Sequence, residues 1–340
     1  MRFAHPEPAP SAVRVWPVFL PFAGCPHRCL FCAQDKQTGR TAQDLDAILR
    51  ELDSDLRDAL DKGRGPYELA FYGGTFTALP APYPEAFLSL AARFREAGLI
   101  TRVRCSTRPD CVAPDTLSRL RALGLDLVEL GIQSFDDGPL TASGRGYSGA
   151  TAKKGCERVK ASGLALGIQL LPGLPGDRPG LFREDVRLAA DLEPETARLY
   201  PCLVVRGTPL ARAWERGEYV PWTTERAVTE LADALRVLWA RGVRVIRMGL
   251  APEETLDESV LAGPHHPALG QSARGLALLS LIREKVRELG GRPTLLEVPR
   301  RYCGELYGHA GELKPAYFEL GLSETAVRFA DGPDFVLERD

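Results

Sequence analysis

Three cysteines lie within a stretch of eight residues near the N-terminus, in the segment GCPHRCLFC at 24–32. Cys25, Cys29 and Cys32 have the spacing Cys-x-x-x-Cys-x-x-Cys, which lets three thiolates converge on one inorganic centre. Iron–sulfur clusters are normally held by four thiolates, and a structural zinc ion also takes four ligands. A set of three therefore borrows its fourth ligand from elsewhere or leaves one position of the centre open.

Two other interpretations of this loop remain open from the residues alone. In the first, the cysteines bind zinc together with His27 or a more distant histidine as the fourth ligand. In the second, they are buried thiols without a chemical role. The chain has eight cysteines and an N-terminus without the apolar segment of a signal peptide. Because disulfides are rare in the cytosol, we expect these cysteines to be reduced thiols or metal ligands.

Composition limits the class of protein. The 340 residues are 44% hydrophobic and carry a net charge of −2, which suits one large domain with a small annex. No apolar stretch approaches the roughly 18 residues that a membrane-spanning helix needs. We therefore expect a cytoplasmic protein that does not enter a membrane. The near-neutral charge gives no general electrostatic argument for binding nucleic acid.

Short apolar runs that are typical of strands alternate with longer helical patterns, and this alternation predicts βα units. Six such units indicate a partial parallel α/β barrel, since a closed barrel uses eight. An open doubly wound sheet is the alternative. The first helix is predicted to start at Thr41, with Asp44 completing a capping pattern. The six predicted strands are 13–20, 67–72, 101–107, 125–133, 164–171 and 197–205.

The alternation changes after about residue 250. We expect a barrel domain over 12–250 and a C-terminal α+β extension over 251–340 that packs on the barrel. The extension is predicted to hold a helix near 271–289 and a strand at 293–299. The proline-rich residues before the barrel are expected to form a loose tail.

Polar and glycine-rich segments follow several predicted strands. The cysteine loop follows the first strand, FYGGTF ends the second, STRPD the third and GIQS the fourth. In a βα barrel the loops after the strands gather at one face, where the functional groups lie. We therefore expect these segments to surround a single site.

At this point the sequence resembles the radical SAM enzymes, whose signature is the same cysteine spacing with an aromatic residue, here Phe31, before the last cysteine. The resemblance implies that three thiolates hold a [4Fe–4S] cluster and that S-adenosylmethionine (SAM) chelates the fourth iron. It also implies a reductant such as flavodoxin or ferredoxin, which drives SAM cleavage to a 5′-deoxyadenosyl radical. By the same resemblance, the residues that contact SAM are Gly73, Gly74 and Thr75 at the amino group, with Ser106, Arg108 and Gln133 as further contacts.

The order of GGTF, TRPD, ELGIQS, RGY and PGLPGD over about 12–250 also resembles the radical SAM domain of the catalytic subunit of the elongator complex. That resemblance implies a nucleoside in tRNA as the candidate substrate. The subunit has a wider gap between its first two cysteines and a downstream acetyltransferase domain, which we do not expect here. Two alternatives are a protein of haem metabolism similar to coproporphyrinogen oxidase, and a non-catalytic iron–sulfur binding module.

Four residues outside these motifs have more than one interpretation. His265 and His266 lie between two prolines and could face substrate or simply bond to backbone. Cys202 and Cys303 could donate a hydrogen atom or ligate a second metal, although free cysteines are more commonly small buried hydrophobes.

Overall fold

Seven parallel strands form the main sheet, and they lie side by side in the order in which they occur in the chain. This computed structural model describes residues 1–9, 11–39, 44–250 and 254–339. The strands are β2 (Arg14–Phe19), β3 (Tyr67–Tyr72), β4 (Ile100–Thr107), β5 (Leu127–Gln133), β6 (Ala165–Leu170), β7 (Thr196–Leu199) and β9 (Arg244–Met248).

This arrangement confirms the predicted partial parallel barrel. A doubly wound sheet would need a reversal of strand order, and the observed order has none. The first five predicted strands are present. The sixth, predicted as 197–205, is divided: β7 ends at Leu199, and β8 (Val204–Val205) pairs with β10 (Val260–Ala262) in a separate two-stranded sheet. Strand β9 adds a strand to the main sheet that was not predicted. Because β2 and β9 do not pair with each other in this sheet, the barrel stays open along one side.

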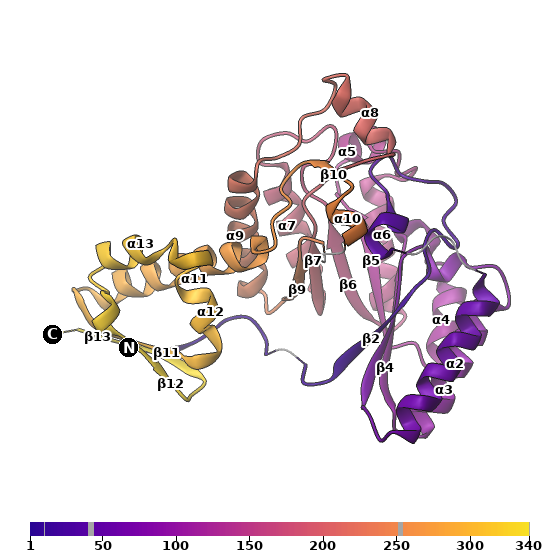
Figure 1. Cartoon of the computed structure of the whole chain (residues 1–340), viewed down its shortest axis with the longest axis horizontal. Helices are drawn as coiled ribbons and strands as arrows, with labels where there is room; N and C mark the ends of the chain where they lie inside the picture. The colour runs from indigo at the N-terminus through magenta and orange to yellow at the C-terminus, as the bar shows by residue number, and fades with distance from the viewer. Residues whose placement is uncertain (10, 40–43, 251–253, 340) are drawn as a thin grey trace.

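Helices cover one face of the sheet (Figure 1). Among the described residues, no helix is both long and apolar enough to cross a membrane. The helices up to the end of the sheet are α1 (Gln34–Thr38), α2 (Leu45–Asp61), α3 (Tyr83–Glu96), α4 (Pro114–Ala122), α5 (Asp137–Ala142), α6 (Gly149–Ala161), α7 (Leu181–Asp191), α8 (Pro209–Glu215) and α9 (Thr224–Ala240).

Helix α2 shows how the sequence sets these elements. Asp44 is its N-cap, and the Asp44 side chain accepts a hydrogen bond from the Asp46 amide. Ile48, Leu52 and Leu56 recur at helical spacing and are buried in the main core. The predicted start at Thr41 lies outside the described residues.

Apolar and polar side chains alternate along the strands, so the sheet has one apolar and one polar face. Leu69 and Phe71 of β3 belong to the core shared with the helices. Their neighbours Glu68 and Tyr72 point to the opposite face, because successive side chains in a strand alternate. The inside of the half-barrel is therefore polar, and it carries the groups described below.

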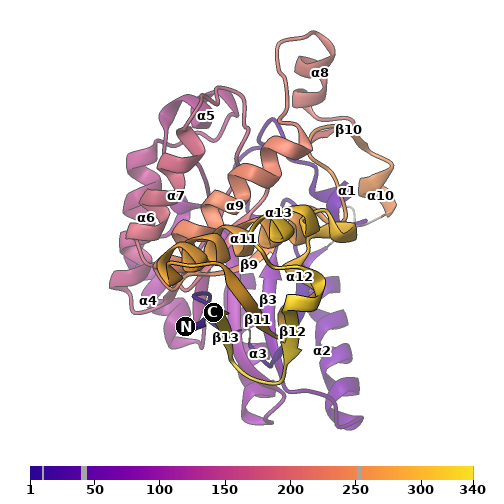
Figure 2. The ribbon, with the colours of Figure 1, turned by 90° about the vertical axis from the view of Figure 1, so that its left-hand side faces the viewer.

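The C-terminal part forms a second sheet with its own core. Strands β1 (Arg2–Ala4), β13 (Asp334–Arg339), β11 (Pro293–Pro299) and β12 (Val327–Ala330) lie in that order. Helix α11 (Leu269–Leu289) contributes both to this core and to the core of the barrel. In Figures 1 and 2 this sheet forms a separate lobe beside the barrel, with the two chain ends next to each other.

The expectation of a loose N-terminal tail is wrong. Strand β1 pairs antiparallel with β13, so the first residues complete the C-terminal sheet. His5 is buried and packs its ring against Trp239 of α9 and against Tyr302. Glu7 forms an ion pair with Arg274 of α11 at 2.5 Å and accepts a hydrogen bond from the Val245 amide. The N-terminal segment therefore joins the two lobes.

Candidate functional site

The cysteine loop leaves β2 through a tight turn that is packed against the end of β3. Phe22 and Gly24 both have positive φ angles, and a Cβ atom on Gly24 would lie 2.4 Å from the Thr75 carbonyl oxygen. The Gln34 side-chain oxygen accepts hydrogen bonds from the Phe22 amide at 2.6 Å and from the Gly74 amide at 3.0 Å. Gln34 therefore fastens the loop to β3, a role that its polar side chain alone did not reveal.

The three thiols of the loop line one cavity. Cys25 Sγ lies 3.3 Å from Thr75 Oγ1, and Cys29 Sγ accepts a hydrogen bond from Arg145 Nη1 at 3.1 Å. Burial raises the pKa of the Cys32 thiol to about 12, and the nearby Cys29 and Cys25 add to the shift. The thiols therefore interact electrostatically, and a positively charged inorganic centre would stabilise their thiolate forms.

The geometry suits a cluster better than a single ion. Among the described residues, no three His, Cys, Asp or Glu side chains are placed to hold one metal ion. The alternative of zinc with His27 is disfavoured further because His27 Nε2 contacts the Gly144 carbonyl oxygen at 2.9 Å. In an iron–sulfur cluster each thiolate binds its own iron, so three thiols spread along the wall of one cavity fit such a group.

The cavity beside these thiols has a volume of about 390 Å³ and opens at the carboxyl ends of the strands. Within the described part of the chain, none of its lining residues is Asp or Glu. The basic residues of the lining are His27, Arg28, Arg108, Arg145, Arg198 and Arg247. Arg108 is paired with Asp110 and Arg198 with Glu129, so the other basic residues of the lining are the ones that favour ligands with negative groups.

The structure brings most of the predicted SAM contacts to this cavity. Phe31, Gly73 and Gly74 line it, and both glycines have positive φ angles of 77° and 58°. Thr75 is fully buried behind Cys25 and does not belong to the lining.

Three further predicted contacts come from the ends of β4 and β5. Ser106, Arg108 and Gln133 line the cavity. The Arg108 guanidinium is paired with Asp110 at 2.9 Å and donates to the Arg145 carbonyl oxygen at 2.6 Å. Gln133 has a positive φ angle of 68°, and its side-chain oxygen accepts from Gln169 Nε2 at 3.3 Å. These groups are thus held in fixed positions around the opening.

Arg145 is the main site residue that the sequence reasoning did not assign, although its RGY motif was noted. It is 6% exposed, and besides Cys29 it donates to the Gly131 carbonyl oxygen at 2.7 Å and to the Tyr147 hydroxyl at 2.9 Å. Burial alone would lower the pKa of Arg145, but Tyr147 and Cys29 outweigh this effect and raise it. Arg145 therefore remains a cation beside the thiol of Cys29.

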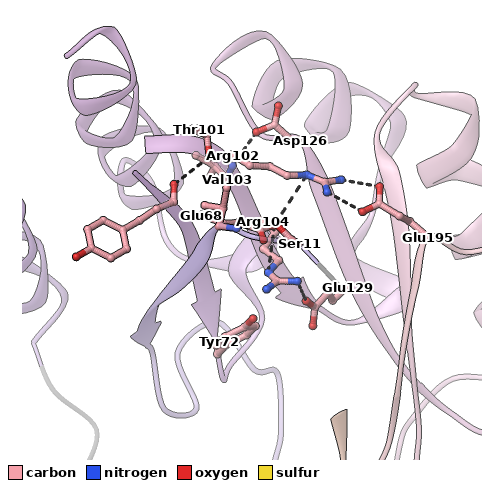
Figure 3. A network of polar contacts seen from close by, with 12 residues as sticks. Ser11, Glu68, Tyr72, Thr101, Arg102, Val103, Arg104, Asp126, Glu129 and Glu195 are labelled. Atoms are coloured by element: carbon pink, nitrogen blue, oxygen red, sulfur yellow. Dashed lines mark hydrogen bonds and ion pairs between the residues drawn. The ribbon is translucent and has the colours of Figure 1, made fainter. Parts of the chain in front are cut away.

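A buried ion network fills the inside of the half-barrel and was also not predicted. Arg104 lies between Glu68 and Glu129 (Figure 3), with its Nη1 3.2 Å from Glu129 Oε1. Arg198 Nε bonds the same carboxylate at 2.6 Å, and Arg198 Nη2 donates to the Tyr72 hydroxyl at 2.6 Å. Glu68, Arg104 and Glu129 are each at most 4% exposed. Since Tyr72 and Arg198 also line the cavity, this network forms its floor.

The remaining candidates lie in different places. Cys202 is buried and lines the cysteine cavity. His265 and His266 line a second cavity at the end of β9. Cys303 is exposed on the short helix α12 (Cys303–Leu306) and belongs to neither lining.

Fold and site together define a class of protein: a partial parallel α/β barrel that carries a three-cysteine loop and an open basic cavity at its carboxyl edge. The sequence pattern of the radical SAM superfamily matches residues 19–189, which is half of the chain. The pattern of the Radical_SAM C-terminal domain matches residues 194–275. The chain therefore belongs to the radical SAM superfamily. Membership confirms the predicted enzyme class and implies a [4Fe–4S] cluster and SAM as cofactors.

Curated relatives support the predicted resemblance to the elongator subunit. The chain is 30% identical over 279 residues to the tRNA uridine(34) acetyltransferase of Methanocaldococcus infernus, which covers 70% of this chain and 52% of the relative. It is 30% identical over 207 residues to Elongator complex protein 3 of Homo sapiens, with 53% and 37% covered. The chain thus spans about half the length, or less, of these relatives.

Solved structures show the same fold. Elp3 of the archaeon Methanocaldococcus infernus, with an N-terminal deletion, superposes with a TM-score of 0.59 at 23% identity, covering 82% of this chain and 64% of that one. Coproporphyrinogen III oxidase of Escherichia coli gives a TM-score of 0.51 at 20% identity, covering 70% and 54%. At these identities the likeness concerns the fold alone.

Proposed function

We propose that this chain holds a [4Fe–4S] cluster through its cysteine loop, cleaves SAM reductively and thereby modifies a nucleoside in tRNA, with uridine 34 as the candidate. The observation that carries the proposal is the set of three thiols facing one basic cavity at the carboxyl edge of the half-barrel. The names of the curated relatives support tRNA uridine as the substrate class.

In this proposal Cys25, Cys29 and Cys32 each bind one iron. A cluster held there would supply the electron for reductive cleavage of SAM into methionine and a 5′-deoxyadenosyl radical. A flavodoxin or ferredoxin is the proposed electron donor. Phe31, which precedes the last cysteine, lines the cavity and packs against the apolar cluster that contains Cys202.

The residues at the strand ends are proposed to orient SAM. Gly73 exposes backbone to the cavity, where a carbonyl oxygen can accept from the methionine amino group. Ser106 and Gln133 offer polar atoms for the ribose, and the Arg108 guanidinium suits the methionine carboxylate. The amide of Gly74 is occupied by Gln34, and Thr75 contacts Cys25. We therefore assign these last two residues to positioning the cysteine loop.

Arg145 has a proposed positioning role. Its hydrogen bond to Cys29 Sγ places a positive charge beside a cluster ligand. Hydrogen bonds to the sulfur ligands are one of the means by which proteins set the reduction potential of an iron–sulfur cluster. The Arg145→Lys variant, which keeps the charge but loses the fixed fork of donors, should therefore bind iron and show a shifted potential.

The test is anaerobic reconstitution of the chain with iron and sulfide, followed by reduction in the presence of SAM. We expect a cluster signal in electron paramagnetic resonance that shifts when SAM is added, and formation of 5′-deoxyadenosine. Alanine at Cys25, Cys29 or Cys32 should abolish both while far-UV circular dichroism stays unchanged. A cluster that ignores SAM would instead support the non-catalytic module.

The substrate part of the proposal has its own test. Modified tRNA nucleosides are compared by mass spectrometry between wild-type cells and a deletion strain, with haem intermediates measured in parallel. Loss of a uridine modification that returns with the intact gene, but not with a Cys32→Ala copy, is the expected result. A change confined to haem intermediates would contradict it.

A further inference from the structure

A second cavity adjoins the cysteine cavity and has no role in SAM chemistry as proposed above. Its volume is about 370 Å³, and it lies between the end of β9, the loop at 264–267 and the beginning of α11. The two cavities share four lining residues, so they adjoin each other at these residues. The shared residues are Pro201, Leu203, Arg247 and Leu250.

Arg247 supplies a positive charge at the junction, where none of the described lining residues is a carboxylate. Its Nε donates to the Gly249 carbonyl oxygen at 3.3 Å, and no ion pair links it to any described residue. Arg274 in the same cavity is different, because Glu7 pairs with it. None of the lining residues in the described part of the chain is acidic. The described lining of the second cavity therefore carries basic side chains and no acidic one.

His266 adds a hydrogen-bond donor to this cavity. Its Nδ1 accepts a hydrogen bond from the Ala268 amide at 3.1 Å, which leaves the proton of the neutral ring on Nε2. Its neighbour His265 is engaged outward, with its Nε2 2.7 Å from Asp257 Oδ1. By the contacts that the structure describes for the two histidines, His266 is the one whose ring N–H is left to donate to a ligand.

The N-terminal end of α11 adds to the positive electrostatic potential in this cavity. The helix has no side-chain cap at Ala268 and no acidic residue in its first turn. A guanidinium, an imidazole N–H and backbone amides are the groups that bind phosphate oxygens in proteins.

We infer that this second cavity binds a phosphate group of the substrate while the base reaches through the junction into the cysteine cavity. The inference rests on the proposed function, because it assigns the substrate a nucleotide rather than a free nucleoside. Arg247 is the central ligand, since it lines both cavities and no ion pair joins it to a carboxylate of the described residues. His266 is the second donor.

The test compares binding of uridine, uridine 5′-monophosphate and an anticodon stem-loop RNA to the cluster-loaded full chain by isothermal titration calorimetry. We expect the monophosphate or the RNA to bind at least about tenfold more tightly than uridine, and inorganic phosphate to compete. In Arg247→Gln this preference should disappear. Arg206→Gln is the matched control, because it removes the same charge from an exposed arginine that lines neither cavity.

The choice of ligands distinguishes two possible sources of the phosphate, namely the target nucleotide itself and the RNA backbone. A preference seen with the monophosphate assigns the cavity to the phosphate of the target nucleotide, and one seen only with the RNA assigns it to a backbone phosphate. Either result supports the inference if Arg247→Gln abolishes it and Arg206→Gln does not. No preference over uridine for either ligand, or a preference that Arg247→Gln retains, would overturn it.

This binding assay does not depend on the proposed function being correct in its chemistry. A chain that forms 5′-deoxyadenosine and modifies tRNA but shows no phosphate preference keeps the function and loses the phosphate site. A chain that shows the Arg247-dependent preference but does not cleave SAM keeps the site and loses the function.

Discussion

Gly74 offers the sharpest test of how the fold positions the cysteine loop. In Gly74→Ala, the new Cβ atom would lie 2.2 Å from the Ala23 carbonyl oxygen and 2.7 Å from the Leu20 carbonyl oxygen. Both belong to the backbone that leads into the cysteine loop, and the Ala23 oxygen also accepts a hydrogen bond from the Thr75 amide at 2.7 Å. The loop must therefore shift and lose that bond.

The magnitude follows from three contributions. A left-handed φ costs an alanine about 1–2 kcal/mol, overpacking adds about 1–3 kcal/mol, and a lost hydrogen bond adds about 1 kcal/mol. Alanine at two other glycines measures the backbone contribution alone. Gly98 has φ of 79° with nothing within 4 Å of its Cβ position, and Gly73 has φ of 77° with no contact shorter than 3.4 Å. Alanine at either position should show only the backbone cost.

The assay measures iron per chain after anaerobic reconstitution, together with the thermal midpoint. Since 1 kcal/mol corresponds to about 2–4 °C for domains of 150–250 residues, Gly98→Ala and Gly73→Ala should each lower the midpoint by a few degrees and keep full iron. Gly74→Ala should lose most of its iron. Iron loading of Gly74→Ala equal to that of Gly73→Ala would refute the argument that this contact fixes the loop.

Three further outcomes are expected. Glu129→Gln leaves the cations of Arg104 and Arg198 without their shared carboxylate, so it should lower the free energy of unfolding in urea by about 3–5 kcal/mol; a loss below about 1 kcal/mol would contradict a tight buried network. Burial, assisted by nearby arginines, lowers the pKa of His5 to about 4, so stability should fall by about 2 kcal/mol from pH 7 to pH 5 in the wild type, and His5→Leu should remove this part of the pH dependence. Cys303→Ser should leave iron content unchanged because Cys303 is exposed and lies outside the cysteine cavity; a loss of iron would point to a second metal.

The sequence predicted those parts of the fold whose signals are local. Strands such as 67–72 combine apolar residues with a following glycine turn, and the cysteine spacing is read directly from the chain. Strand β9 was not predicted because two of its five residues are arginines. In the structure only one of the five residues is fully buried. A five-residue run that contains two charged side chains is not typical of a buried inner strand.

Contacts between distant segments could not be predicted in the same way. The bond from Arg145 to Cys29 joins residues 116 positions apart, and nothing near either residue specifies it. The inward-facing charges Glu68, Arg104 and Glu129 alternate with apolar residues, which is the pattern of an ordinary solvent-facing side of a strand. Only the curvature of the sheet turns that side inward.

The pairing of β1 with β13 also sets an order of events during synthesis. Met1 and Leu337, which share a hydrogen bond, are 336 positions apart. The barrel strands are all complete by residue 248, so the barrel can form on the ribosome while β1 still waits for its partner. Until β13 emerges, β1 has no partner strand in this sheet, and its edge stays exposed to solvent or to chaperones. A translation arrest after the barrel would therefore release a chain whose cysteine loop is built but whose C-terminal sheet is incomplete.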